Sequence, residues 1–169
     1  MGIIKLTFRF KFGILYITEK SIIKNLSIKE IIYKMARKIL VVDDERHIAR
    51  LIQVNLERVG YIVITAENGK EALEKIESDR PELVILDVMM PVMDGLETLK
   101  TIRATPGICE LPIIMLTAKT QDQDVFRGYS LGVDIYLTKP FNPAELIGFV
   151  KRVFDDQQKN AGGGHVYTL

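Results

Sequence analysis

The run Leu83-Val84-Ile85-Leu86-Asp87 constrains the fold of this chain more than any other stretch. Four consecutive aliphatic residues, closed by an acid, indicate a strand that is buried on both faces. Such strands are typical of the centre of a parallel sheet. In open α/β sheets the ligands bind beyond the carboxyl ends of the strands, which is where Asp87 falls. Aspartate also caps turns, so this residue taken alone leaves a purely structural role open.

Further strands and helices alternate along the chain after Met35. Apolar or alternating runs predict strands at 38–42, 61–66, 112–117 and 134–138. Apolar residues at helical spacing predict helices at 48–59, 68–80, 95–105 and 121–131, and a last helix that begins at Pro143. Five strands that alternate with five helices, joined by right-handed crossovers, predict an α/β fold with a doubly wound parallel sheet. The periodicity leaves the strand order open.

Charge and composition exclude several classes of protein. Residues 1–34 hold seven Lys or Arg and two Glu, a net charge of +5, which leaves −4 for residues 35–169 because the total is +1. An acidic main domain argues against direct binding of nucleic acid, and no apolar run is long enough to span a bilayer. The single cysteine, Cys109, supplies neither an intramolecular disulfide nor a zinc site by itself. We therefore predict a cytoplasmic protein.

The first 34 residues differ in composition from the rest. Ile, Lys, Phe, Tyr and Asn, which A/T-rich codons encode, make up 21 of them. Phe8, Phe10 and Phe12 alternate with polar residues as in a strand, and 21–35 has the spacing of a basic amphipathic helix. One functional interpretation of such a helix is binding to a membrane surface.

The sequence from Met35 onward looks like an ordinary start directly before a strand. We therefore interpret residues 1–34 as an N-terminal extension that is non-native or disordered. Residues 36–155 form the predicted folded domain. Residues 156–169, which are polar and contain three consecutive glycines, are predicted to be a flexible tail.

Polar residues stand at the carboxyl ends of four predicted strands: Asp43 and Asp44, Asp87, Thr117, and Lys139. Because these ends meet at one edge of a parallel sheet, we expect the side chains to lie together. Three neighbouring carboxylates repel each other and raise one another's pKa values unless a cation joins them. Oxygen ligands without His or Cys favour a divalent ion such as Mg²⁺.

A carboxylate beside a lysine and a bound cation suits a phosphoryl group. The cation and Lys139 can neutralise the phosphoryl oxygens while Thr117 donates a hydrogen bond. A carboxylate can itself be the nucleophile and form an aspartyl phosphate.

Four blocks carry a resemblance to a known family: VVDDE, LVILDVMMPVMDG, MLTA and YLTKPF, in this order. Together they resemble the receiver domain of the response regulators of two-component systems, and the resemblance covers about residues 36–155. It implies a flavodoxin-like fold like that of the chemotaxis regulator, with strand order 2-1-3-4-5.

The resemblance also implies roles for individual residues. Asp87 matches the family's phosphorylation site. Asp44 and Asp87 match its direct Mg²⁺ ligands, together with the backbone carbonyl of Met89, while Asp43 acts mainly through metal-bound water. Thr117 matches a residue that holds the phosphoryl oxygens.

The last strand carries the remaining matches. Lys139 matches the second residue that holds the phosphoryl oxygens in the family. The peptide bond between Lys139 and Pro140 matches one that is cis in the family. Tyr136 matches an aromatic switch position whose two orientations alter the surface of about residues 121–154. A downstream protein or a second copy is expected to bind there.

The function implied is that of a phosphorelay switch. It accepts a phosphoryl group from a histidine kinase or phosphotransfer protein and catalyses only its own phosphorylation and slow dephosphorylation. A hydrolase that forms an aspartyl phosphate is one alternative. Such an enzyme needs a second acid two residues after the nucleophile, but that position is Met89 here. A DNA-binding regulator is another, but only about fifteen residues follow the last helix, too few for a helix-turn-helix module. We therefore predict a stand-alone receiver, unless the sequence is a fragment.

Overall fold

The computed structural model describes residues 7–10, 13–16, 36–118 and 132–162. The chain divides into two compact units, residues 1–35 and 36–169. In the first unit, β1 (Thr7–Phe10) and β2 (Gly13–Tyr16) pair as an antiparallel hairpin. The helix predicted at 21–35 lies outside the described residues. That the first 34 residues are non-native or disordered stays a prediction.

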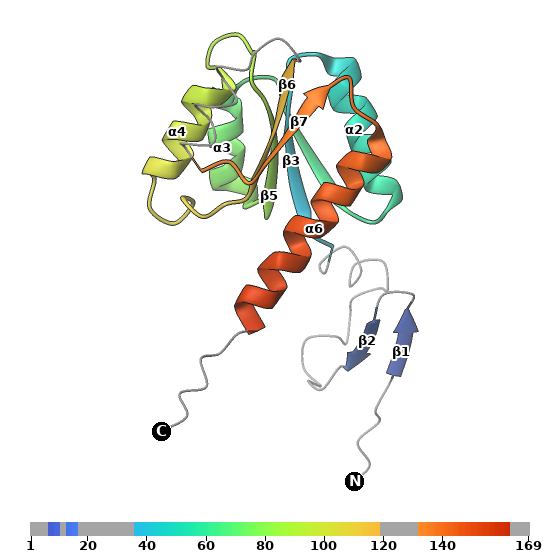
Figure 1. Cartoon of the computed structure of the whole chain (residues 1–169). Coiled ribbons are helices and arrows are strands. Elements are labelled where there is room, and N and C mark those ends of the chain that lie inside the picture. Colours follow the sequence, from blue (N-terminus) through green and yellow to red (C-terminus); the bar gives the residue numbers. More distant parts are fainter. Residues whose placement is uncertain (1–6, 11–12, 17–35, 119–131, 163–169) are drawn as a thin grey trace. The chain divides into compact units, whose positions relative to one another are not determined.

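The second unit is built on a five-stranded parallel sheet (Figure 1). Its strands are β3 (Lys38–Val42), β4 (Ile62–Ala66), β5 (Leu83–Asp87), β6 (Ile113–Ala118) and β7 (Ile135–Lys139). They lie in the order β4-β3-β5-β6-β7, and every neighbouring pair is parallel. Counted from the first strand of this unit, the order is 2-1-3-4-5, so the predicted fold class is confirmed. All five residues of β5 are buried.

Helices cover both faces of this sheet. Helices α2 (Arg46–Arg58) and α6 (Pro143–Gly162) lie on one face, and α3 (Gly69–Asp79) and α4 (Gly95–Ala104) on the other (Figure 1). The helix predicted at 121–131 falls outside the described residues. Among the described residues, no helix combines the length and apolar character that crossing a membrane requires.

Side-chain caps fix the start of two of these helices. The side chain of Asn68 accepts a hydrogen bond from the backbone N–H of Glu71 at 3.0 Å, at the start of α3. Asp94 does the same for Glu97 at 2.8 Å, at the start of α4. Such caps satisfy backbone donors that have no partner within the helix. They place the N-terminal ends of both helices near the carboxyl edge of the sheet.

The sheet separates two hydrophobic cores because successive side chains of a strand point to opposite faces. On β5, Leu83 and Ile85 belong to the core under α2 and α6, whereas Val84 and Leu86 belong to the core under α3 and α4. β3 alternates in the same way. Both central strands therefore carry four consecutive apolar residues, so that their sequence is continuous rather than alternating.

Helix α2 buries a narrower stripe than the sequence indicates. Ala49, Ile52 and Leu56 are buried, but Leu51 and the C-cap residue Val59, two further apolar residues of the range predicted as helix, are 43% and 44% exposed. One residue along a helix corresponds to a turn of about 100°, so Leu51 points well away from Ile52.

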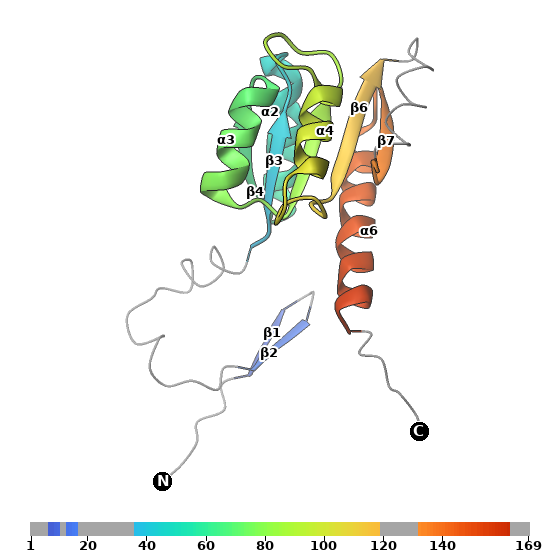
Figure 2. The ribbon, with the colours of Figure 1, turned by 90° about the vertical axis from the view of Figure 1, so that its left-hand side faces the viewer.

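Helix α6 begins at Pro143 as predicted and continues through Gly162, past position 156 where the flexible tail was expected to begin. In Figure 2 it runs beside β7 and beyond the ends of the strands. Gln157 lies within this extension and accepts a hydrogen bond from Arg37 at 3.3 Å. The change to polar residues therefore does not end the helix.

Arg103, near the end of α4, joins the connections at the opposite edge of the sheet. Its guanidinium donates to the carbonyl oxygens of Cys109 at 2.9 Å and Leu111 at 2.8 Å. It also donates twice to the carbonyl oxygen of Gly132, at 2.8 and 3.0 Å, and lies 3.4 Å from the carboxylate of Asp134. One side chain thus ties α4 to the segments that enter β6 and β7.

Val92, in the loop between β5 and α4, has a left-handed backbone conformation with φ of 70° and an exposed fraction of 80%. A β-branched residue is strained in this region, whereas Asn tolerates it. We expect Val92→Asn to raise the free energy of unfolding by about 1 kcal/mol, because the backbone strain is relieved and no packing is lost. Urea denaturation measures the change. Val59→Asn, an exposed valine with negative φ, is the control, and an equal gain there would refute the strain argument.

Candidate functional site

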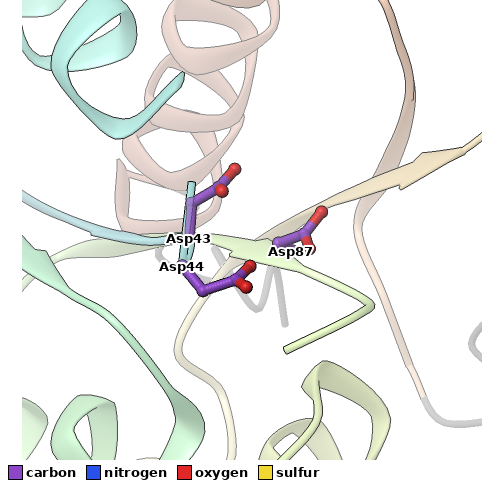
Figure 3. A group of neighbouring side chains, drawn as sticks. All are labelled: Asp43, Asp44 and Asp87. Carbon is purple, nitrogen blue, oxygen red and sulfur yellow. The ribbon is translucent and has the colours of Figure 1, made fainter. Parts of the chain in front are cut away.

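Three carboxylates meet at the carboxyl edge of the sheet. Asp43 and Asp44 follow β3, and Asp87 ends the neighbouring strand β5. One oxygen from each lies within 4.8 Å of the others (Figure 3). Asp43 and Asp87 are buried and Asp44 is exposed. The structure thus brings together the three acids that the sequence placed at these strand ends.

Lys139, at the end of β7, reaches across the edge of the sheet to two of these acids. Its Nζ lies 2.8 Å from Asp43 Oδ2 and 2.8 Å from Asp87 Oδ1. Its side chain is only 17% exposed. The peptide bond from Lys139 to Pro140 is cis. Lys139 therefore holds a partly buried positive charge between the two buried carboxylates.

Burial sets the electrostatics of this group. It raises the pKa of Asp43 and of Asp87 above their ordinary values, although the hydrogen bond and charge of Lys139 oppose the rise. Burial alone would lower the pKa of Lys139, but its contacts with the two carboxylates outweigh this and raise it. The lysine is therefore charged, and its single charge does not fully compensate the carboxylates. A second cation would be favourable here.

The loop after β5 shapes the surroundings of Asp87. The carboxylate oxygen that faces away from the lysine, Oδ2, accepts a hydrogen bond from Met89 N at 3.2 Å. Gly95 N donates to Val88 O at 2.9 Å. A Cβ atom at Gly95 would lie 2.1 Å from the carbonyl oxygen of Asp87. Helix α4 therefore begins directly against the backbone of Asp87, and only glycine permits that approach.

Thr117 and Tyr136 lie on the same face of the sheet. Met115 of β6 pairs with Tyr136 of β7, and Thr117 follows Met115 by two positions. Thr117 is buried, and its hydroxyl donates to the carbonyl oxygen of Ala118 at 3.3 Å. Tyr136 is partly buried against the core under α3 and α4. This shared face is compatible with a threonine–tyrosine switch, whose two states remain a prediction.

Glu45 was not among the residues predicted for the site. Its Oε1 lies 3.5 Å from Lys139 Nζ, and its backbone N–H donates to Asp43 Oδ1 at 2.9 Å. The available signal was its position, directly after the acid pair and at the start of a helix. Nothing in the spacing indicated that its side chain turns toward a lysine 94 residues away.

The chemistry of the acid cluster suits a hard divalent cation. Asp43, Asp44 and Asp87 offer carboxylate oxygens, and neither His nor Cys belongs to this cluster. Oxygen ligands of this kind match Mg²⁺. Asp87 contacts Lys139 at 2.8 Å and also belongs to the three carboxylates that could hold a cation.

Comparisons with known proteins agree on one family. Residues 39–151 match the model of the response regulator receiver domain. Over 119 residues the chain is 51% identical to the alkaline phosphatase synthesis transcriptional regulatory protein PhoP of Bacillus subtilis (strain 168), which covers 70% of this chain and 49% of PhoP. The chain thus spans about half the length of this curated relative.

Solved structures of similar fold agree with this match. The chemotaxis response regulator CheY4 of Vibrio cholerae is 39% identical with a TM-score of 0.66, over 70% of this chain and 99% of CheY4. A CheY-like response regulator receiver domain protein of Methanospirillum hungatei JF-1 is 31% identical with a TM-score of 0.69, over 74% of this chain and 98% of that protein.

Proposed function

This chain belongs to the family of response regulator receiver domains, and from that premise we propose that it is a signalling switch phosphorylated on Asp87. The observation that carries the proposal is the pair of 2.8 Å contacts from Lys139 to Asp87 and Asp43. They put a partly buried positive charge beside the carboxylate that becomes the nucleophile. The donor is a histidine kinase or a phosphotransfer protein.

The reaction is a phosphoryl transfer to a carboxylate. An oxygen of Asp87 forms a bond to phosphorus while the bond from phosphorus to the donor's leaving group breaks. Lys139 balances the negative charge of the transferred group, and Thr117 donates a hydrogen bond to one of its oxygens.

The acid cluster would hold Mg²⁺. Asp44, Asp87 and the backbone carbonyl of Met89 are the proposed direct ligands, and Asp43 acts mainly through water. When bound, the ion adds positive charge that offsets the repulsion between the carboxylates and the phosphoryl oxygens. The raised pKa values of Asp43 and Asp87 support this need for a further cation.

Output is proposed to follow from Tyr136 and the surface of about residues 121–154. Movement of Thr117 toward the phosphoryl group leaves space that the aromatic ring can occupy, which changes this surface for a downstream protein or a second copy. Within this surface the structure describes residues 132–154. The stand-alone organisation remains a prediction, because the chain spans about half of PhoP. The cytoplasmic location also remains a prediction.

A hydrolase is the less favoured function. Hydrolysis of external phosphate esters through an aspartyl phosphate requires an acid that protonates the leaving group. The position two residues after Asp87 is Met89, whose thioether is exposed and carries no proton to donate. We therefore expect negligible turnover of an aryl phosphate.

The test is phosphorylation with acetyl phosphate and Mg²⁺, followed by detection of the acid-stable, base-labile acyl phosphate. The wild-type protein is expected to be labelled, and Asp87→Asn is expected to abolish the label because the nucleophile is lost. Asp94→Asn is a matched control, because either residue can cap α4. Undiminished labelling of Asp87→Asn would refute the assignment of the acceptor.

A further inference from the structure

A third carboxylate approaches Lys139. Asp43 and Asp87 contact its Nζ at 2.8 Å from buried positions, and Glu45 Oε1 lies 3.5 Å from the same atom. The Glu45 side chain is 51% exposed, whereas those of Asp43 and Asp87 are 0% and 8% exposed. Of these three carboxylates, Glu45 is the one that can move into solvent without disturbing the core.

Helix capping does not explain the position of the Glu45 side chain. Glu45 is the N-cap residue of α2, but its side chain accepts no capping hydrogen bond. Asn68 and Asp94, the N-caps of α3 and α4, both make such bonds. The hydrogen bond from Glu45 to Asp43 uses the backbone N–H, so it does not depend on the side chain. What the carboxylate of Glu45 contacts is Lys139 and, at 3.8 Å, His47 Nε2.

The negative charge of Glu45 opposes the approach of an anionic phosphodonor. Glu45 lies outside the group Asp43, Asp44 and Asp87 that could share a metal ion. Its negative charge therefore repels an incoming anion and occupies the lysine that this anion needs. A phosphoryl oxygen that binds Lys139 must compete with the Glu45 carboxylate.

We propose that Glu45 is a positioning residue that competes with the phosphoryl group for Lys139 and thereby weakens the capture of small anionic phosphodonors. This inference rests on the proposed phosphorylation of Asp87. A partly exposed ion pair changes an equilibrium by about 1.5- to 5-fold. Effects of this size are expected for Glu45→Gln, which removes the charge and keeps the shape, and in the same direction for Glu45→Ala.

The first measurement is the reactivity of Lys139 itself, in the absence of any phosphodonor. Acetylation by acetic anhydride, followed by peptide mass spectrometry, is expected to be about 1.5- to 5-fold faster in Glu45→Gln, because one of the three carboxylates that hold the Lys139 side chain in place is removed. Glu67→Gln is the control, since Glu67 is an exposed acid paired with Arg46 at 2.9 Å.

The second measurement is the rate of phosphorylation as a function of acetyl phosphate concentration. Glu45→Gln is expected to lower the half-saturating concentration by about 1.5- to 5-fold with little change in the maximal rate. The difference should shrink at about 1 M salt, where screening acts over roughly 3 Å. Glu67→Gln should leave the half-saturating concentration unchanged.

The outcomes separate this inference from the proposed function. If the reactivity of Lys139 is unchanged in Glu45→Gln, the contact between Glu45 and Lys139 is overturned, whether or not the protein is phosphorylated. Changed reactivity with an unchanged half-saturating concentration overturns the competition and leaves the proposed function standing. An equal effect of Glu67→Gln means that only net charge matters and overturns the inference. A wild-type protein that acetyl phosphate does not label on Asp87 overturns the proposed function, and the inference with it.

Discussion

Gly95→Ala is expected to lower the free energy of unfolding by about 3 kcal/mol and to remove most of the phosphoryl labelling of Asp87. The new Cβ would lie 2.1 Å from the carbonyl oxygen of Asp87 and 3.0 Å from its carbonyl carbon and from the Cα of Val88. These are backbone atoms of a buried strand and the loop that follows it, so no side chain can rotate away. Either α4 or the nucleophile must shift.

Urea denaturation measures the loss of stability, and labelling with acetyl phosphate under conditions where the variant is folded measures the loss of the site. Gly148→Ala is the control, because Gly148 lies within α6 and nothing surrounds its Cβ position. Alanine is the better helix former, so this control should gain up to about 1 kcal/mol. Wild-type unfolding and labelling of Gly95→Ala would contradict the close approach of α4 to Asp87.

Lys139→Ala is expected to lower the free energy of unfolding by about 3 kcal/mol near neutral pH, because it leaves two buried carboxylates without their cation. Burial already raises the pKa of Asp43 and Asp87, and Lys139 limits the rise. Without Lys139 both folded-state pKa values rise further above the unfolded values. An acid whose pKa is raised on folding destabilises the folded state when ionised, and this loss is recovered as the pH falls through its folded-state pKa. The deficit of Lys139→Ala should therefore shrink on acidification.

The free energies of unfolding of the wild type and the variant are compared from neutral to mildly acidic pH, in the absence of divalent cations. This comparison checks the size of the deficit and the direction in which it changes with pH. Lys75→Ala is the control. Lys75 pairs with Glu71 at 2.6 Å, but both side chains are about one-third exposed, so its removal should have an effect below about 1 kcal/mol. A deficit of Lys139→Ala that grows on acidification would contradict the argument.

The sequence was sufficient to predict the sheet, because a strand that is buried on both faces is recognisable as a run of apolar residues. The first four residues of β5 are apolar as a consequence of two covered faces, and the polar residues at the ends of the strands lie at one edge because parallel strands end together. The strand order came from the resemblance to a family. Periodicity records which face a residue occupies and not which strand lies beside it.

The contacts that the sequence did not predict depend on long side chains or on backbone atoms. Lys139 was expected near Asp87, but its contacts with Asp43 and Glu45 depend on rotamers that no local pattern specifies. Arg103 binds mainly carbonyl oxygens, which every residue possesses, so its partners leave no signal in the sequence. Gly95 was interpreted as the start of a helix, and only the three-dimensional structure reveals the backbone against which it packs.

The division of the core by the sheet has a consequence for how this sequence can change. Ile85 and Leu86 are joined by a peptide bond, yet they belong to different cores. A change of volume at Ile85 can be relieved by Val41 or Ile114, which lie beside it on the neighbouring strands and share its core, and not by Leu86. Substitutions on β5 are therefore expected to be epistatic with distant positions on the same side of the sheet and nearly independent of their own chain neighbours. Strand β5 therefore evolves under two separate sets of packing constraints.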